Sequence, residues 1–366
     1  MRINNVAHDS REAATASSRG RQPTDRIRNE HVSREAAAAD AIAVAASRLA
    51  IECRFLCCGL TPAAMCSRRF ATQYGATCAL LCVLLLTLAA STSAAEPQRL
   101  THDGRMKFNP SFINENEIGF VDYEKPTLTI IKRLSLKDGS VTPLHENVDK
   151  QELEPAFWGD ARYSAFHRAS GTLQTSLVIR DEKDNENIEL PPGAGFSGYR
   201  CPAFSPDGAI VVFSFADEGQ QNLFTVNRKD GKDRKQLTKL TRINNWPDFS
   251  PDGKRIVFGS TRDDNFELYS MKSDGTDVVR LTDNPFQDVR PKYSPDGNHI
   301  AFVSTREGNH EVYVMKSDGS ELQRVTRHEE RDDYPEWHPD GKHLVMVCER
   351  NGSHDLYLLP VAELDY

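Results

Sequence analysis

Short apolar segments alternate with tight polar turns between Trp246 and Thr282. The central segment, Ile256 to Phe258, is apolar at every position, which is typical of a strand packed on both faces. The turn Ser250-Pro251-Asp252-Gly253 combines a proline, which fixes φ, with a glycine, which permits positive φ. A second turn contains Asp274-Gly275. The pattern predicts four short strands, at 247–249, 256–258, 268–271 and 279–282.

The same pattern recurs from Arg290 to Thr326, and a proline opens each copy. Such prolines stand at Pro110, Pro155, Pro202, Pro247, Pro291 and Pro335, at spacings of 45, 47, 45, 44 and 44 residues. Four strands in a repeating unit of about 40 to 50 residues are typical of a propeller blade. The sequence therefore predicts an all-β fold, a six-bladed β-propeller over residues 96–366.

The two ends of the repeat region predict how the ring closes. The last unit has no fourth strand after its third, at 355–359, whereas Gln98 to Thr101 resembles Val279 to Thr282. Thr101 also precedes Pro110 by 9 residues, the spacing found in the later units. We therefore expect the N-terminal strand to complete the last blade, because closure removes an exposed sheet edge.

The first 95 residues have a different character. Residues 1–64 lack a strand pattern and are expected to be a disordered or mis-assigned N-terminal extension. From Met65, a basic pair, an apolar run at 78–90 and small residues at 93–95 follow one another, the order of a signal peptide over residues 65–95. A membrane anchor is the alternative, but the run is shorter than the roughly 20 residues a spanning helix needs. We expect cleavage near Ala95, no stable membrane span after cleavage, and a periplasmic or secreted protein.

Charge and cysteine content agree with one exported domain after residue 95. The formal net charge is −8, and the first 95 residues hold 11 arginines against 7 acidic residues, so the acidic excess lies in the repeats. An acidic body without a basic stripe argues against nucleic-acid binding. Six of the 8 cysteines precede residue 96, and Cys201 and Cys348 fall in units on opposite sides of the ring, too far apart for a disulfide. We expect a monomer.

The repeated unit, clearest from Trp246 to Leu359, reads P-x-[FYW]-S-P-D-G-x-x-[IL]-x-[FM], followed by [LV]-Y-x-[ML], D-G and R-L-T. It resembles the WD-like β-propeller repeat of the TolB family, which serves the Tol–Pal system of the periplasm. The resemblance implies a propeller fold and an envelope protein or peptide as partner. TolB carries an α/β domain before its propeller, whereas only residues 96–109 lie between the expected cleavage point and the first repeat here.

Binding residues are expected on the face that carries the loops between second and third strands, because these loops vary between units. Arginines recur 15 residues after three of the prolines, and Asn or Asp recurs three residues before them. These groups either line the channel mouth or form Arg–Asp pairs that hold the scaffold, and their repetition favours the scaffold. The candidate partner-binding residues on this face are Asp263, Asp264, Asp288, Arg306, Glu329, Asp332, Asp333 and Arg350.

Catalytic and metal-binding patterns are incomplete. His310 and His354 share one register of the repeat and His299 and His343 another, so each register has two histidines where a catalytic zinc site needs three ligands. The segment 195–198 does not match G-x-S-x-G. We therefore expect no catalytic residues, no metal ligands and no cofactor, with Ca²⁺ or another divalent cation in the channel as an open alternative.

These observations favour an exported, non-catalytic propeller that binds a protein or peptide partner at the loop face of its channel, with a TolB-like role in the cell envelope. The alternative is a metal-dependent lyase or hydrolase that acts on polysaccharide in the channel. Metal analysis of the purified protein separates the two.

The predicted export has a direct test. Mass spectrometry of the protein isolated from its native cells should find a mature N-terminus near Glu96, because the small residues at 93–95 form the cleavage site. Peptides from residues 1–64 on the mature protein would contradict this prediction.

Overall fold

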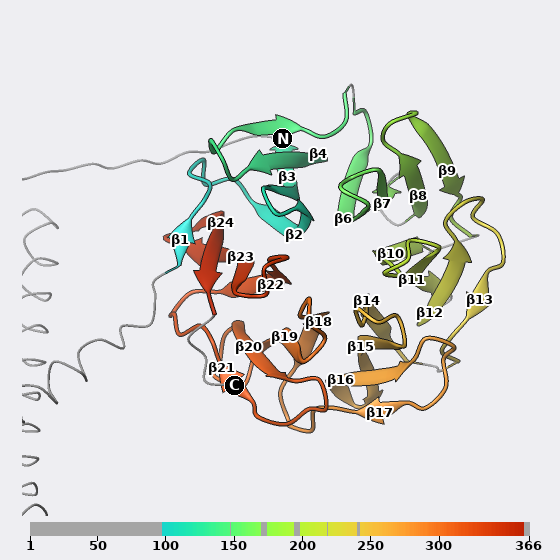
Figure 1. The fold of residues 1–366 in the computed structure, drawn as a ribbon. Helices are drawn as coiled ribbons and strands as arrows, with labels where there is room; N and C mark the ends of the chain where they lie inside the picture. Colours follow the sequence, from blue (N-terminus) through green and yellow to red (C-terminus); the bar gives the residue numbers. More distant parts are fainter. Residues whose placement is uncertain are drawn as a thin grey trace, which may run out of the picture. The chain divides into compact units, whose positions relative to one another are not determined.

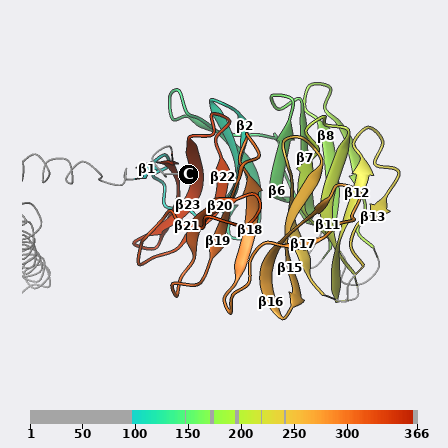
Figure 2. The same cartoon turned by 60° about the horizontal axis from the view of Figure 1, so that its bottom comes forward.

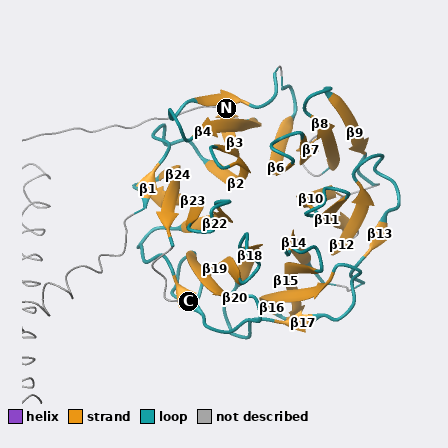
Figure 3. Ribbon diagram, viewed as in Figure 1, coloured by secondary structure: helices purple, strands orange, loops and turns teal. Residues whose placement is uncertain are grey.

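The computed structural model describes residues 97–361, except 147, 170–173, 194–197, 218, 240–241 and the side chain of Asp217. The chain divides into two compact units, Met1–Thr92 and Ser93–Tyr366, and every described residue belongs to the second. The predicted extension and signal peptide therefore lie outside the described residues. The described part consists of strands and loops without a helix (Figure 3), so it holds no helix that could cross a membrane.

The strands form five hydrogen-bonded sheets within the described residues. The first comprises β2 (Lys107–Asn114), β3 (Glu117–Lys125), β4 (Leu128–Ser135) and β5 (Val141–Pro143). Two more comprise β14 (Asn244–Phe249), β15 (Arg255–Asp263), β16 (Asn265–Lys272) and β17 (Val279–Arg280), and then β18 (Asp288–Tyr293), β19 (His299–Ser304), β20 (Glu311–Lys316) and β21 (Gln323–Arg324). The fourth joins β22 (Asp332–Trp337), β23 (His343–Arg350) and β24 (Ser353–Pro360) to β1 (Gln98–Arg99).

The fifth sheet has eight strands. They are β6 (Gln151–Trp158), β7 (Tyr163–Ala169), β8 (Thr175–Asp181), β9 (Glu186–Leu190), β10 (Gly198–Phe204), β11 (Ile210–Asp217), β12 (Gln220–Asn227) and β13 (Lys235–Gln236). All five sheets stand around a central axis, with β2, β6, β10, β14, β18 and β22 innermost (Figure 1). Turned by 60°, the strands run side by side across the thickness of the ring (Figure 2).

The prediction of an all-β propeller is confirmed, but the structure does not have six separate four-stranded sheets. Four sheets have four strands, whereas the strands of the second and third repeats share one eight-stranded sheet. The two groups join where Gly198 of β10 pairs in parallel with Thr175 of β8. The backbones can approach here because residue 198 has no side chain: a Cβ on it would lie 2.3 Å from Thr175 Oγ1. The Thr175 hydroxyl donates to the Tyr199 carbonyl oxygen over 2.8 Å.

Strand β15 shows why the central strands are apolar at every position. Ile256 and Phe258 pack in one cluster with Leu223 of the preceding sheet, and Val257 packs with Ile300 of the following sheet. Successive side chains of a strand point to opposite faces. All three β15 side chains are 0% exposed. Each sheet is therefore held between two neighbours, and this double burial stabilises the ring.

The predicted pairing of the N-terminal strand with the last sheet is confirmed. Strand β1 runs antiparallel to β24, with Arg99 opposite Tyr357. The Thr101 hydroxyl donates to Asp355 Oδ1 (2.7 Å) and accepts the Leu356 N–H (3.0 Å), and Arg99 Nη2 lies 2.5 Å from Asp355 Oδ2. Asp355 is 1% exposed, and its carboxylate is held by residues 99 and 101 together with the buried Lys107, whose Nζ lies 3.2 Å from Oδ1.

The same arrangement recurs in the two preceding sheets. In one, the Thr326 hydroxyl donates to Glu311 Oε2 (2.5 Å) and Arg324 Nη2 lies 3.1 Å from Glu311 Oε1. In the other, Thr282 and Arg280 bind Glu267 in the same way. The N-terminal segment thus provides for the last sheet what a fourth strand provides in its neighbours.

Removing the Thr101 hydrogen bonds should destabilise the propeller. We expect Thr101→Val to lower the free energy of unfolding by about 1–3 kcal/mol, because it removes one of the hydrogen bonds to the buried Asp355 and leaves the Leu356 N–H without its acceptor. Urea denaturation measures the loss, and His102→Ala, at an exposed neighbour, is the matched control.

Deleting residues 97–101 should have a larger effect, with aggregation through the exposed edge of β24. Hydrogen exchange gives a second readout, because the Leu100 N–H donates to the Leu356 carbonyl oxygen over 2.8 Å and should be protected. Rapid exchange at Leu100 in the intact protein would contradict the proposed stabilising role of this segment.

Candidate functional site

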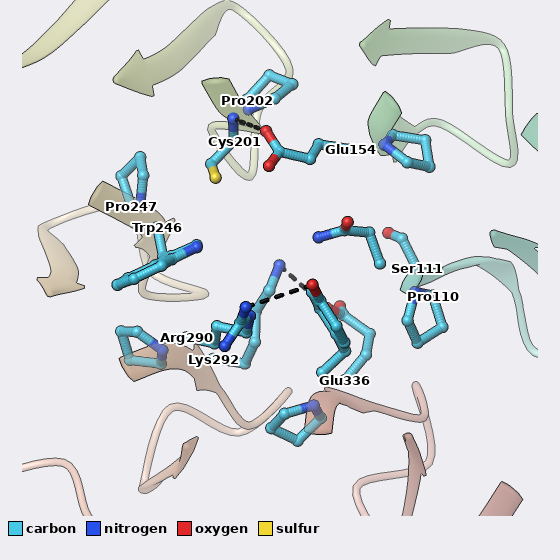
Figure 4. A pocket seen from close by; sticks show the side chains of 15 residues that line it. Pro110, Ser111, Glu154, Cys201, Pro202, Trp246, Pro247, Arg290, Lys292 and Glu336 are labelled. Atoms are coloured by element: carbon cyan, nitrogen blue, oxygen red, sulfur yellow. Dashed lines mark hydrogen bonds and ion pairs between the residues drawn. The ribbon is translucent and has the colours of Figure 1, made fainter. Parts of the chain in front are cut away.

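The innermost strands surround a channel with about 520 Å³ of open space. Every one of these strands contributes its repeated proline to the wall: Pro110, Pro155, Pro202, Pro247, Pro291 and Pro335. Figure 4 shows four of the side chains that precede these prolines, Glu154, Cys201, Trp246 and Arg290, facing a common space. The channel is the candidate site because residues from all six inner strands meet there.

The residue before each proline has an unusual backbone conformation. Its φ lies between 47° and 56° in all six strands, at Asn109, Glu154, Cys201, Trp246, Arg290 and Tyr334. Such left-handed values are uncommon for residues other than glycine. The pairing with the second strand shifts register at the same place, for example between Val289 and Lys292, which marks a β-bulge. Bulges re-aim side chains, and all six of these residues line the channel.

The six bulges present six different side chains. The prolines repeat, whereas the preceding residues are an amide, an acid, a thiol, an indole, a guanidinium and a phenol. A position that only maintained the scaffold would be expected to repeat with it. Because these six side chains differ, the channel wall has a different chemical character on each of its sides.

One side of the channel combines aromatic rings with a guanidinium. The Arg290 Cζ lies 5.3 Å from the Trp246 ring centre and 4.2 Å from that of Tyr334. Arg290 Nη1 also lies 3.2 Å from Asp333 Oδ1. Burial alone would raise the pKa of Asp333, but Arg290, His310 and nearby Arg331 outweigh it and hold that pKa at about 2. Arg290 is therefore fixed between two rings that can contact an incoming ligand.

The opposite side is acidic. Glu154 accepts the Cys201 N–H over 2.6 Å and lies 3.1 Å from His167 Nδ1. Burial would raise the pKa of Glu154, but His167 and Arg200 outweigh it and lower that pKa to about 2. Burial and the adjacent Glu154 raise the pKa of the Cys201 thiol well above its usual value. Cys201 is therefore a neutral thiol rather than a thiolate nucleophile.

The residues that follow three of the prolines form a charged cluster in which one lysine bridges two carboxylates, and Figure 4 shows its Lys292–Glu336 pair. Lys292 Nζ lies 3.0 Å from Glu336 Oε2 and 3.4 Å from Asp248 Oδ1. Burial opposes the charge on Lys292, but the two carboxylates outweigh it and raise the pKa of Lys292. Burial raises the pKa of Asp248 and of Glu336 even though Lys292 attracts both. Three inner strands, β14, β18 and β22, are linked by this cluster.

The structure places most of the predicted repeated charges in pairs inside single sheets. Asp288 is 0% exposed, and Arg306 Nη2 lies 3.0 Å from its Oδ2. Asp332 is paired in the same way with Arg350, at 2.8 Å. None of these four residues lines the channel described above. Their geometry matches the scaffold interpretation.

The unrepeated acids lie in different settings. Asp263 is half exposed and accepts the Tyr269 hydroxyl, while Asp264 is 93% exposed and lies 3.6 Å from Arg242. Glu329 is exposed, whereas Asp333 is buried and holds the channel arginine described above. Of the predicted set, Asp333 is therefore the residue that the structure connects directly to the channel.

Sequence reasoning missed the ring of residues that precede the prolines. The prolines were used only to count the repeats, although the sequence also shows that the residue before each proline differs from repeat to repeat. A repeated proline after a changing residue was the available signal. The bulge that turns these residues inward depends on pairing with the second strand, which no single repeat reveals.

One group of possible metal ligands occurs among the described residues, His338, Asp340 and His343, in the turn between β22 and β23. His338 Nδ1 accepts the Asp340 N–H over 3.0 Å, and His343 Nδ1 lies 2.8 Å from Asp340 Oδ2. Ser250 holds the corresponding turn of an earlier repeat by accepting the Arg255 N–H over 2.9 Å. These contacts hold the turn, and the group lies outside the channel lining.

Together, the repeated strands and the channel define a repeat-built β-propeller with a central channel. The chain belongs to the TolB β-propeller domain family, whose model matches residues 115–284 and 230–363. The Tol-Pal system protein TolB of Francisella tularensis subsp. mediasiatica is 32% identical over 85 residues, which cover 23% of this chain and 19% of that protein. The chain spans 17 to 29% of the length of the curated relatives it matches.

Solved structures show the same architecture. A TolB-like protein from Agrobacterium tumefaciens is 26% identical, with a TM-score of 0.50 over 57% of this chain and 73% of that one. An oligogalacturonate lyase in complex with manganese gives a TM-score of 0.53 at 15% identity, over 75% of this chain and 95% of that one. At this identity the lyase shows the fold alone.

The scaffold interpretation of Asp288 predicts a loss of stability without a loss of binding. We expect Asp288→Ala to lower the free energy of unfolding by about 1–3 kcal/mol, because Arg306 loses its partner in a largely buried place. Thermal and urea denaturation measure the change, and Glu329→Ala, at an exposed carboxylate, is the control. Unchanged stability together with lost partner binding would make Asp288 a binding residue instead.

Proposed function

We propose that this protein is an exported, non-catalytic propeller that binds a protein or peptide partner at the loop face of its channel, in a TolB-like role in the cell envelope. The family membership and the TolB relatives support an envelope role. In this proposal residues 65–95 are a cleaved signal peptide and the mature protein is a periplasmic or secreted monomer. The eight-stranded sheet counts as two blades, six in all, because each half carries its own channel proline.

The observation that carries the proposal is the ring of six bulges. Left-handed conformations of residues other than glycine cost free energy and cluster at binding sites. Here the same costly conformation recurs in six strands, and each time it directs a different side chain into one channel. Such a surface can distinguish partners by their chemistry.

The two sides of the channel suggest how a peptide would be held. Trp246 and Tyr334 offer ring faces and edges on either side of Arg290, which suit an apolar or aromatic partner side chain. Glu154, across the channel, carries a charge at neutral pH and suits a basic group. The exposed acids Asp263, Asp264 and Glu329 would add weaker contacts at the rim.

The alternative, a metal-dependent lyase or hydrolase, rests on the fold shared with the manganese-bound lyase. Among the described residues, the group with three closely spaced metal ligands lies in a turn outside the channel lining. A divalent cation in the channel would instead have to use Glu154 and Glu336, the carboxylates that line it. Metal analysis of the purified protein tests this alternative.

Partner binding can be tested with two channel variants. Trp246→Ala removes a ring from the wall, and Asn109→Trp replaces a small wall amide with a bulky ring that narrows the channel. Immobilised wild-type protein should retain a partner from envelope extract, and either variant should retain at least about tenfold less, the loss of a typical central contact.

Val279→Ala, at a 45% exposed side chain on the outer strand β17, is the matched control and should retain the partner fully. Circular dichroism and melting temperatures establish that each variant is folded. Equal retention by folded channel variants and the control would contradict binding in the channel. Metal-dependent cleavage of polysaccharide by the wild-type protein would favour the alternative.

A further inference from the structure

A second pocket lies on the face of β11 and β12 and is built around Arg234. The Arg234 Cζ lies 4.3 Å from the centre of the Phe215 ring and 4.4 Å from that of Phe224. The buried rings of Tyr199 and Phe213 lie beneath them, with centres 5.7 and 5.8 Å from Cζ. The pocket is open to solvent and is lined further by Gln220 and Gln236. It shares no lining residue with the channel.

This pocket occurs where the repeat departs from its own pattern. Three other sheets bury an acid held by an arginine and a threonine, as at Glu311, Arg324 and Thr326. In the sheet of β10–β13 the acid is replaced by Asn222 and the arginine by Gln236. The Thr238 hydroxyl still donates to Asn222 Oδ1 over 2.9 Å. The fold is retained here while both charges are gone.

With the acid and the arginine replaced by amides, Arg234 is the one charged side chain among the described residues that line the pocket. Arg234 contacts the four aromatic rings and the Tyr199 hydroxyl, which lies 3.5 Å from Nη1, and no carboxylate of the described residues forms an ion pair with it. Arg234 is exposed, so its charge is open to solvent. A guanidinium stacked on rings uses its face for the stacking, and its N–H donors at the edge remain available.

We propose that this pocket binds a hexuronate, a sugar that carries a carboxylate. The guanidinium edge of Arg234 pairs with the carboxylate, because the planar fork of N–H donors matches the two oxygens. The amides of Gln220 and Gln236 each offer donors and an acceptor for sugar hydroxyls. The Phe215 and Phe224 rings hold the guanidinium in place. The site is independent of partner binding in the channel.

A purely structural role for Arg234 is the competing explanation. Long basic side chains can cover apolar rings with their methylene groups while the charge stays in water. That role requires no ligand and would be met by an apolar side chain of similar length. Arg234→Met therefore separates the two explanations, because it keeps a long side chain over the rings and removes the charge.

The test is a titration of the mature protein followed by amide NMR, with D-glucuronate, D-glucose and acetate as separate probes. We expect D-glucuronate to shift signals of β11 and β12. D-glucose, which lacks the carboxylate, and acetate, which lacks the hydroxyls, should each bind at least about tenfold more weakly, the effect of losing a charge-assisted or paired set of hydrogen bonds.

Arg234→Met should weaken D-glucuronate binding at least about tenfold, since it removes the charged pair. Lys235→Met is the matched control: it removes the same charge one residue away from a side chain outside the pocket lining, and binding should not change. Melting temperatures establish that both variants are folded. Gln220→Ala provides a second variant that leaves the aromatic wall and Arg234 in place.

Three results would overturn the proposal. One is equal binding of D-glucose and D-glucuronate, which would remove the role of the carboxylate. Another is acetate binding as tightly as D-glucuronate, which would make the pocket a simple carboxylate site. The third is equal D-glucuronate binding by the wild-type protein and Arg234→Met, including no binding by either, which would leave Arg234 as a cover for the rings.

Discussion

Burial of the central strands on both faces is the constraint on which the rest of this structure depends. Along β19, Ala301 packs toward the sheet of β22–β24, whereas Ile300 and Phe302 pack toward that of β14–β17. The last sheet does the same, since Val345 packs with Phe120 of the first. A sheet with two apolar faces needs a neighbour on each side. A ring satisfies this for every sheet, and so the first and last repeats must meet.

The contact between the first and last repeats also explains the polar network between the third and fourth strands of the sheets. A buried carboxylate in the third strand needs a hydroxyl and a guanidinium from the fourth, and Asp355 finds both at the other end of the chain, in Thr101 and Arg99. In the strands β10–β13, Asn222 replaces the acid and Gln236 the arginine. An amide can accept the threonine hydroxyl without needing a cation, so the fold tolerates the change.

The channel differs from the rest of the ring because its residues do not repeat. The scaffold dictates proline and a bulge in each inner strand, but it leaves the preceding side chain free to vary. Electrostatic environments therefore differ across a short distance: Glu154 is kept ionised by His167 and Arg200, while burial shifts Asp248 and Glu336 toward their neutral forms. The repeat therefore fixes where the channel residues lie, and the differences between repeats determine which chemical groups they carry.

The sequence by itself determined the strand pattern, the repeat length and the role of the N-terminal segment. These follow from local signals: turn residues at fixed offsets, apolar runs such as Ile256 to Phe258, and a threonine at a constant distance from the next proline. The pairing of Asp288 with Arg306 was also accessible, because both recur in one register. The sequence alone did not reveal which residues form the channel wall.

Only the tertiary structure decided which side chains meet. The bulge at each proline depends on register with the neighbouring strand, and it turns Trp246, Arg290 and Tyr334 toward one another across 88 residues of sequence. The parallel pairing of Gly198 with Thr175, which merges two repeats into one sheet, likewise depends on how closely two backbones approach. Local pattern encodes the strands, because turns and burial act within a repeat. Contacts between repeats depend on side chains far apart in the chain, which packing alone brings together.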